Sequence, residues 1–392
     1  MDRVVYQEID MSGQISENPN RQSGTIGPVA SAIKDSSNPA MTTNPSGGVG
    51  AEWINTTSGE IFLCIDATTN FNVWVGQEGS RVFPARGIFM GGKNAASPSV
   101  EVNTIDYVTI STLGNATDFG DLGTPVEHNA ATSNGIKGRA VSGGGTYTGS
   151  SASVNVLEYV TISTPGDAQD FGDLTISTRQ FGATSNASND RGVFGGGYTG
   201  SATTNVIGYI TVSSAGNATD FGDCSTVGMQ DNSATSSGTN ERGLWFGGNR
   251  TSMSNVIDYV TISTPGNATD FGDLTQTVSY AAACSNQTNE RAVRAGGYVW
   301  PVSPNITDVI DYITMSTPGN ATDFGDLDPE IYSARGTSDG TEERGLCTVG
   351  GYPGGVNTAK IQYITISTPG NAQDFGDLTV ARANYGAASD AG

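Results

Sequence analysis

The sequence predicts an all-β protein whose larger part is a six-bladed β-propeller. A segment that reads Tyr-Val-Thr-Ile-Ser-Thr-Pro-Gly-Asn-Ala-Thr-Asp-Phe-Gly-Asp-Leu at 259–274 occurs in six copies, which start 52, 50, 50, 53 and 51 residues apart. A repeat period near 50 residues is typical of a propeller blade. Only 36% of the 392 residues are hydrophobic and 54 are glycine, as expected of short strands joined by many turns. The copies begin at Tyr107, Tyr159, Tyr209, Tyr259, Tyr312 and Tyr363.

The residues that precede the repeats divide into two parts. Residues 1–48 are rich in Ser, Asn, Gly and Pro without apolar periodicity, which predicts an extended arm that orders on a partner. Residues 49–80 contain three apolar runs separated by turn residues, and Trp53, Phe62 and Trp74 fall on successive runs. This pattern predicts a small three-stranded β module. The propeller is then expected over residues 81–392.

Each repeat is expected to form four strands, as in the unit that begins at Arg179. Residues 179–186 carry small side chains, which suit the crowded innermost strand of a blade. Residues 191–197 end in glycines and residues 205–213 alternate like a strand covered on both faces. Residues 220–224 complete the blade as a short outer strand.

The phase of the repeats predicts how the propeller closes. The strand at 86–92 has no small-residue strand before it, whereas the chain ends with one at 384–392. Pairing these two strands completes six blades and leaves no exposed edge. Residues 385–389 are therefore expected beside residues 87–91.

Several of these recurrent residues resemble known repeats. The glycine pair after the second strand, the Asp-Tyr pair in the third and the aromatic residue in the fourth together resemble the kelch repeat, although Phe119 and its equivalents stand where kelch repeats usually have Trp. The recurrent Asn-Ala-Thr-Asp-Phe-Gly-Asp-Leu is similar to propeller repeats in structural proteins of marine tailed bacteriophages, chiefly those of cyanobacteria. The apolar pattern of residues 48–76 resembles a module near the N-termini of phage fibre and appendage proteins.

This resemblance covers residues 86–392 in the repeats and implies a bacteriophage virion structural protein, such as a tail fibre, appendage or decoration protein. Such a protein is made in the host cytoplasm and carried on the virion in multiple copies. Residues 1–80 would then dock onto other virion proteins.

A pair of aspartates three residues apart recurs in every repeat, as in Asp118 and Asp121. Together with Asn115, such a loop presents the oxygen ligands that Ca²⁺ prefers. The preferred interpretation is a turn whose Asp and Asn side chains accept backbone N–H groups, with no cofactor. The first members of the pairs are Asp118, Asp170, Asp220, Asp270, Asp323 and Asp374.

One arginine opens the second strand of every blade. We expect each arginine to pair with one of the aspartates, because a bidentate ion pair satisfies both groups. The set is Arg86, Arg139, Arg191, Arg242, Arg291 and Arg344.

Composition excludes several classes of function. The net charge of −21 with only 18 basic residues leaves no basic surface for phosphates, so nucleic-acid binding is not expected. No long apolar run and no cationic-apolar start is present, so neither membrane insertion nor a signal peptide is expected, and the Asn-Ala-Thr triplets are interpreted as turns. Cysteines with no metal or disulfide spacing are expected to be small buried hydrophobes. They are Cys64, Cys224, Cys284 and Cys347.

Catalysis is not expected. The single histidine, His128, is assigned to an inner strand and supplies neither a two-histidine metal site nor a Ser-His-Asp arrangement. The recurrent arginines are one per blade and so do not form the cluster that binds sialic acid. We therefore expect a non-enzymatic protein. The alternative is a polysaccharide hydrolase or lyase of a tail spike, which would need acids gathered on one face.

The loops after the second and fourth strands share one face and differ between repeats, whereas the Ser-Thr-Pro-Gly-Asn turns on the opposite face are nearly identical. The varied loops contain Tyr147, Tyr198, Tyr298, Trp300 and Tyr352 among Ser, Thr, Asn and Gly. This composition suits stacking on sugars or contact with protein, so a host-surface glycan or protein is the expected ligand. Packing of some of these rings beneath their own loops is an equally weighted alternative.

Overall fold

The computed structural model describes residues 32–40, 42–57, 59–69, 72–76, 81–82, 85–95, 99–225, 229–249, 252–301, 305–348, 350–352 and 356–391. The chain divides into two compact units, Met1–Phe83 and Pro84–Gly392. Both are built from β-strands, and within the described ranges the helical elements are five single turns of 3₁₀-helix. The protein is all-β.

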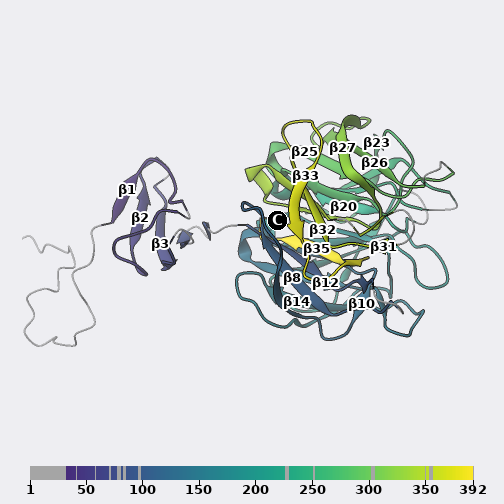
Figure 1. Ribbon diagram of the computed structural model, residues 1–392, viewed down its shortest axis with the longest axis horizontal. Coiled ribbons are helices and arrows are strands. Elements are labelled where there is room, and N and C mark those ends of the chain that lie inside the picture. Colours follow the sequence, from purple (N-terminus) through teal and green to yellow (C-terminus); the bar gives the residue numbers. More distant parts are fainter. Residues whose placement is uncertain are drawn as a thin grey trace, which may run out of the picture. The chain divides into compact units, whose positions relative to one another are not determined.

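The first unit is a five-stranded sheet in the order β1-β2-β3-β4-β5 (Figure 1). β1 is parallel to β2, and the other neighbours are antiparallel. One face buries Phe62, Cys64, Trp53 and Trp74, and the last two rings meet edge to face with centroids 6.1 Å apart. The strands are β1 (Ile33–Asp35), β2 (Glu52–Asn55), β3 (Ile61–Asp66), β4 (Val73–Gly76) and β5 (Arg81–Val82).

Two expectations for this region are wrong. The sheet has five strands and not three, because β1 and β5 extend it at its two edges. β1 lies inside the segment expected to be an extended arm, and it is held by its own chain: Ile33 pairs with Trp53, whose indole N–H donates to the carbonyl of Ser37 at 2.8 Å. Residues 1–31 of the expected arm lie outside the described residues. β5 places Arg81 and Val82 in the first unit.

The second unit contains six four-stranded antiparallel sheets among its described residues, numbered here in chain order. Sheet 1 is β35 (Gly386–Ser389), β6 (Arg86–Met90), β8 (Thr104–Thr109) and β9 (Thr117–Asp121); sheet 2 is β11 (Ala130–Ser133), β12 (Arg139–Gly143), β14 (Val156–Thr161) and β15 (Gln169–Asp173); sheet 3 is β16 (Gly182–Ser185), β17 (Arg191–Gly195), β18 (Val206–Thr211) and β19 (Thr219–Asp223). Sheet 4 is β20 (Ser233–Ser236), β21 (Arg242–Phe246), β22 (Val256–Thr261) and β23 (Thr269–Asp273); sheet 5 is β24 (Ala282–Ser285), β25 (Arg291–Ala295), β26 (Thr307–Thr314) and β27 (Thr322–Ile331); sheet 6 is β28 (Arg335–Ser338), β29 (Arg344–Thr348), β32 (Lys360–Thr365) and β33 (Gln373–Asp377).

Short elements complete the unit. The first and second strands of sheets 2 to 6 are joined by 3₁₀ turns, and short strand pairs form in some of the loops. The turns are η1 (Gly135–Lys137), η2 (Ala187–Asn189), η3 (Gly238–Asn240), η4 (Gln287–Asn289) and η5 (Gly340–Glu342), and the loop strands are β7 (Lys93–Asn94) with β34 (Arg382–Ala383), β10 (Val126–Glu127) with β13 (Thr146–Tyr147), and β30 (Gly351–Tyr352) with β31 (Val356–Asn357).

The strands expected from the repeat are present. In sheet 3, β17, β18 and β19 lie within two residues of the expected ends at 191–197, 205–213 and 220–224. The first strand begins later than expected because Gln180 adopts a left-handed backbone conformation with φ of 59°. An arginine opens the second strand of every sheet, as expected.

The C-terminal strand pairs with N-terminal sequence, as expected. Gly386 lies opposite Met90, and Ser389 lies opposite Gly87. The carboxylate of Asp390 also accepts a hydrogen bond from the backbone N–H of Arg86 at 2.7 Å. In Figure 1 the yellow strand β35 accordingly lies among the blue strands of the first repeat.

The first strands of the six sheets lie side by side in a closed circle. β11 contacts β16 and β35, and the succession continues through β20 and β24 to β28, which contacts β35. Small side chains from all six strands line a central cavity, among them Ala131, Ala183 and Ala234.

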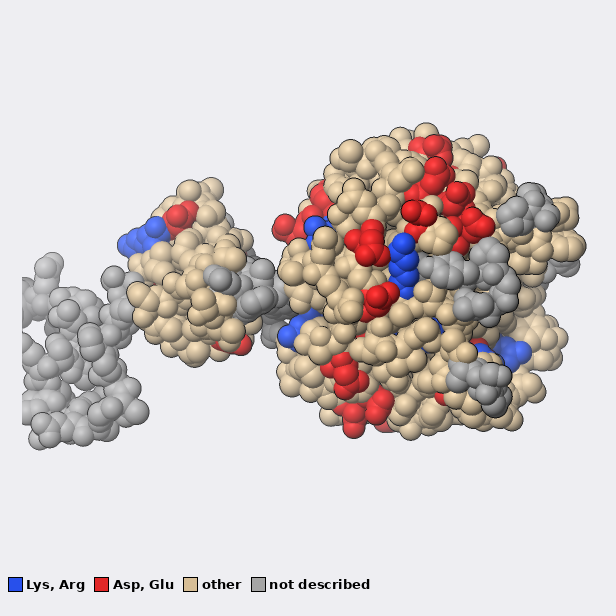
Figure 2. Space-filling model, viewed as in Figure 1, with Lys and Arg blue, Asp and Glu red and all other residues tan. Residues whose placement is uncertain are grey.

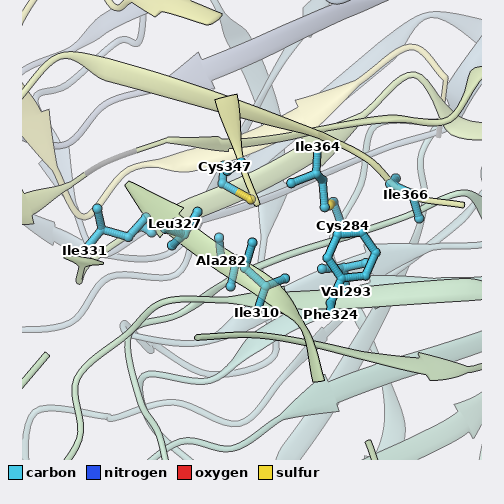
Figure 3. Close-up of a cluster of buried hydrophobic side chains, with 13 residues drawn as sticks. Ala282, Cys284, Val293, Ile310, Phe324, Leu327, Ile331, Cys347, Ile364 and Ile366 are labelled. Carbon is cyan, nitrogen blue, oxygen red and sulfur yellow. The ribbon is translucent and has the colours of Figure 1, made fainter. Parts of the chain in front are cut away.

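The hydrophobic core lies between neighbouring sheets. Figure 3 shows one such cluster, in which Val293, Ile310 and Phe324 of sheet 5 face Cys347 and Ile364 of sheet 6. All four cysteines of the chain are buried and unbridged, which confirms their expected packing role. Each interface therefore buries side chains that a single sheet would leave exposed.

Candidate functional site

The six recurrent arginines join neighbouring sheets. The guanidinium of Arg139 lies 4.2 Å from the ring centroid of Tyr159 in its own sheet, a cation–π contact. Its Nη1 donates to the carbonyl of Val212, just beyond β18 of the next sheet, at 3.1 Å. Equivalent bonds run from Arg86 to Ile162, Arg191 to Ile262, Arg242 to Met315, Arg291 to Ile366, and Arg344 to Ile110.

The expected pairing of these arginines with aspartates is wrong. Among the described residues, none of the six arginines has a carboxylate within ion-pair distance. The tyrosine ring and the neighbouring carbonyl already occupy the guanidinium, and Asp118 and its equivalents lie exposed on the fourth strands. These arginines are structural because they hold one sheet to the next.

The aspartate pairs lie in strands and not in turns. Asp170 and Asp173 belong to β15, whose end is held by the third-to-fourth-strand loop of sheet 3. Asn217 Oδ1 in that loop accepts the backbone N–H of Asp173 at 3.1 Å, so the asparagine acts as the expected acceptor but across the interface between sheets. Matching bonds link Asp121 to Asp167, Asp223 to Asn267, Asp273 to Asn320, Asp326 to Asn371 and Asp377 to Asn115.

The recurrent glycine fits this same contact. Gly172 has φ of 143°, and a Cβ there would lie 2.6 Å from the carbonyl of Gly216 in the loop of the next sheet. Any larger residue would push the loop away. The motif Asp-Phe-Gly-Asp thus docks one sheet onto the next.

The exposed aspartates do not form a metal site in the described part of the chain, where no group of three His, Cys, Asp or Glu side chains is placed to hold an ion. Burial, followed by the charges of Asp167 and Asp118, raises the pKa of Asp121. Figure 2 shows acidic side chains gathered in groups on the visible surface, with few basic ones between them.

The aromatic residues expected to bind ligand lie in loops of four different sheets. Trp300 is 60% exposed, whereas Tyr147, Tyr198 and Tyr298 are partly buried. Tyr352 lies in β30, and its side chain is outside the described part. The four side chains that are described belong to loops of three different sheets.

Packing beneath the loops explains the partial burial of the tyrosines. Tyr147 packs against the core between sheets 1 and 2. The guanidinium of Arg179 lies 5.3 Å from the ring centroid of Tyr198, and the hydroxyl of Tyr298 accepts a hydrogen bond from Asn305 at 3.1 Å. Of the four rings in the set whose side chains are described, Trp300 alone is exposed for most of its surface.

A second set of residues encircles one end of the central cavity. Each member stands two residues before a first strand and has a left-handed backbone, with φ between 53° and 61°. Backbone bonds connect five of the members in succession, from Tyr280 through Asp231, Gln180 and His128 to Asn384, whose carbonyl accepts the N–H of His128 at 2.6 Å. The carbonyl of Tyr280 accepts the N–H of Ala334, the neighbour of the sixth member. We define this set as the polar ring: His128, Gln180, Asp231, Tyr280, Ser333 and Asn384.

The polar ring lies at the face that carries the varied loops. The residues just before it bridge to those loops, as Arg179 does to Tyr198 and Ser279 to Tyr298. Within the ring the side-chain amide of Gln180 donates to the hydroxyl of Tyr280 at 2.8 Å. His128, expected in an inner strand, instead precedes β11, because the left-handed turn delays the start of that strand.

Three ring members have strongly shifted pKa values, and burial raises that of Tyr280 well above its ordinary value. Burial raises the pKa of Asp231 to about 7, against smaller opposing contributions from Tyr280 and Arg335. Neither carboxylate oxygen of Asp231 accepts a hydrogen bond of good geometry. Burial, with the positive charges of Arg335 and Arg179, lowers the pKa of His128 to about 3, so its imidazole is neutral at pH 7.

Arg335 reaches into the cavity beneath the ring. It opens β28, where the other five sheets have only Ala, Gly or Ser. It lines a space of about 40 Å³ together with Phe181, Asn232 and Ser233. One guanidinium N–H donates to the carbonyl of Ala334 at 2.9 Å, and among the described residues no carboxylate lies within ion-pair distance.

Sequence analysis missed the polar ring and Arg335. When the six repeats are aligned with one another, one position could have indicated the ring. It lies two residues before each inner strand, holds a different residue in every repeat and is polar in each. A backbone conformation with positive φ usually selects Gly or Asn. Six polar side chains at such positions indicate that the side chains themselves are used.

The chain matches no family model and no curated protein. Among the described residues, no helix has the length and apolar character needed to cross a membrane.

Proposed function

We propose that the six sheets are the blades of a six-bladed, kelch-like β-propeller closed by the C-terminal strand. Support comes from the closed circle of first strands, the central cavity that they line and the pairing of β35 with β6. A propeller presents the loops of one face around its axis, so this architecture would gather the varied loops and the polar ring on one surface.

We further propose that the chain is a non-enzymatic structural protein of a tailed-bacteriophage virion, a tail fibre, appendage or decoration protein. The N-terminal unit docks onto other virion proteins, and the propeller binds a host-surface glycan or protein. It acts in multiple copies on the virion and without a metal or other cofactor. The resemblance of the repeats and of the N-terminal module to phage proteins supports this assignment.

One observation carries the binding proposal. The contacts between sheets repeat almost unchanged in all six sheets, whereas the polar ring differs at every position and the loops beside it differ in length and sequence. A purely structural propeller has no need for diversity confined to one face. The partly exposed polar groups around Trp300 and the ring suit the hydroxyl groups of a glycan.

Binding to a panel of bacterial surface polysaccharides tests this proposal. The full chain should bind at least one member, and Trp300→Ala should weaken binding because that ring is exposed in a varied loop. Leu113→Ala is the matched control: Leu113 is also exposed, at 54%, but lies in the turn on the opposite face. Equal loss in both variants, or no binding to any member, would contradict the proposal.

A single observation favours the alternative, a polysaccharide hydrolase or lyase. A buried carboxyl whose pKa is about 7, as for Asp231, is suited to proton transfer near neutral pH. Release of reducing ends or of unsaturated products from a bound polysaccharide, lost in Asp231→Asn, would establish that activity. Its absence with binding intact supports the non-enzymatic assignment.

A further inference from the structure

Arg335 has no carboxylate within ion-pair distance among the described residues. Its side chain lines the central cavity, and its guanidinium donates a hydrogen bond to the carbonyl of Ala334. Burying a charged group without a counter-charge is costly. Asp231 is the acid whose charge interacts with the guanidinium of Arg335. Burial raises the pKa of Asp231 to about 7, so its carboxyl is mostly protonated below that pH. The site is therefore positively charged in mildly acidic to neutral solution.

The cavity admits only a small group. Its volume of about 40 Å³ corresponds to roughly three water-sized spheres. A planar carboxylate fits this space and the forked geometry of a guanidinium, which can donate two parallel hydrogen bonds to it. A phosphate group is larger than a carboxylate and is not planar.

The polar ring contains buried polar atoms without a hydrogen-bond partner in the protein. His128 Nδ1 and Asn384 Oδ1 are two of them. A sugar whose hydroxyl groups reach the ring would satisfy such atoms.

We infer that the central cavity is a subsite for the carboxylate of an acidic sugar, with Arg335 as its counter-ion and the polar ring contacting the sugar hydroxyls. This inference rests on the proposed glycan binding and specifies its ligand as a uronic or sialic acid unit. Arg335 fixes the preference for acidic over neutral sugars, while the surrounding loops contact the rest of the glycan.

Calorimetric titration of the full chain at pH 6.5 tests the inference. The probes are D-glucuronate, D-galacturonate and N-acetylneuraminate, with D-glucose and D-galactose as neutral matches and acetate as a carboxylate without a sugar. At least one acidic sugar should bind with a single saturable site, at least tenfold tighter than its neutral match and than acetate. Binding of no acidic sugar, or equal binding of acetate, overturns the inference.

Arg335→Gln should reduce the affinity for the acidic sugar at least tenfold, whereas Arg335→Lys should retain part of it. Arg179→Gln is the matched control, because Arg179 lies near the ring but outside the cavity lining. Melting curves establish whether each variant is folded. If Arg335→Gln is unfolded, the affinities of the unmodified chain for acidic and neutral sugars still test the inference.

The polysaccharide panel separates the two proposals. If polysaccharide binding depends on Trp300 but is unchanged in Arg335→Gln, the subsite is wrong and the glycan-binding face stands. If neither polysaccharides nor acidic sugars bind, both proposals fail.

Discussion

Replacement of Asp231 by Asn should change how stability depends on pH. Asp231 is 3% exposed, and its burial raises its pKa from 3.8 to about 7. In the unfolded chain the carboxyl ionises near its ordinary pKa, so between about pH 4 and pH 7 the folded state binds the extra proton. The free energy of unfolding therefore decreases progressively as the pH rises from about 4 to about 7.

The magnitude follows from the shift. About three pKa units at 1.36 kcal/mol each give a loss of about 4 kcal/mol across the window, as an upper value. Asn has nearly the same shape and does not titrate. The groups that act on the Asp231 carboxyl are Arg335 and Tyr280, with the amides of Gln180 and Gln230, and all remain in the variant.

Urea unfolding of both proteins at pH 4.5, 6.0 and 7.5 measures this effect. The free energy of unfolding of Asp231→Asn minus that of the unmodified chain should rise by several kcal/mol from pH 4.5 to 7.5. Taking this difference cancels the contributions of other titrating groups. One of them is His128, whose lowered pKa makes the folded protein less stable as the pH falls, the opposite of the effect of Asp231. A difference that stays constant over this range would show that the carboxyl is hydrated or paired, and would refute the argument from burial.

Three further outcomes follow from the contacts described. Deleting residues 385–392 should abolish cooperative unfolding or lower the melting temperature sharply, because Tyr385 is fully buried and loss of such a ring alone costs about 3–5 kcal/mol; an unchanged melting curve would contradict closure by β35. Arg139→Ala should cost about 2 kcal/mol in urea unfolding through its lost carbonyl bond and cation–π contact, whereas Asp118→Asn should cost almost nothing. Adding Ca²⁺ to chelator-treated protein should leave the melting temperature unchanged; a site filled at a hundred times its Kd would instead add about 2.7 kcal/mol.

Sequence alone predicted the sheets of the second unit well, because the pattern repeats. Six copies of one motif average out the ambiguity of any single strand, and the unpaired strands at the two ends of the repeat array left one arrangement for residues 386–389. The first unit has no such repetition. A three-residue strand such as Ile33–Asp35 is recognised only from its pairing with Trp53 and its neighbours.

The candidate site was harder to predict because tertiary contacts decide it. Opposite charges in one repeat suggested an Arg–Asp pair, but the sequence does not show that a tyrosine ring and a carbonyl of the next sheet lie closer to Arg139. The residues of the polar ring are far apart in the chain and share no residue type. Only the left-handed backbone that they have in common and their equivalent places, two residues before the six first strands, identify them as a set.

The contacts between sheets have a consequence for chain connectivity. The bond from Arg344 to Ile110 and the bond from Asp377 to Asn115 hold sheet 6 to sheet 1 with the same atoms that hold every other pair, and residues 378–385 link the two sheets along the chain. The joint between the two ends of the repeat array lies instead inside sheet 1, where β35 pairs with β6 as every other first strand pairs with its second. The pair formed by β35 and β6 thus differs from the other pairs of first and second strands only in that no peptide segment joins its two strands. Since Asp390 lies against Arg86, a short linker can fuse the two ends of the repeat array, and circular permutants opened in any varied loop should recover the same structure. Duplication of one fifty-residue unit is the simplest history for a molecule with such interchangeable joints.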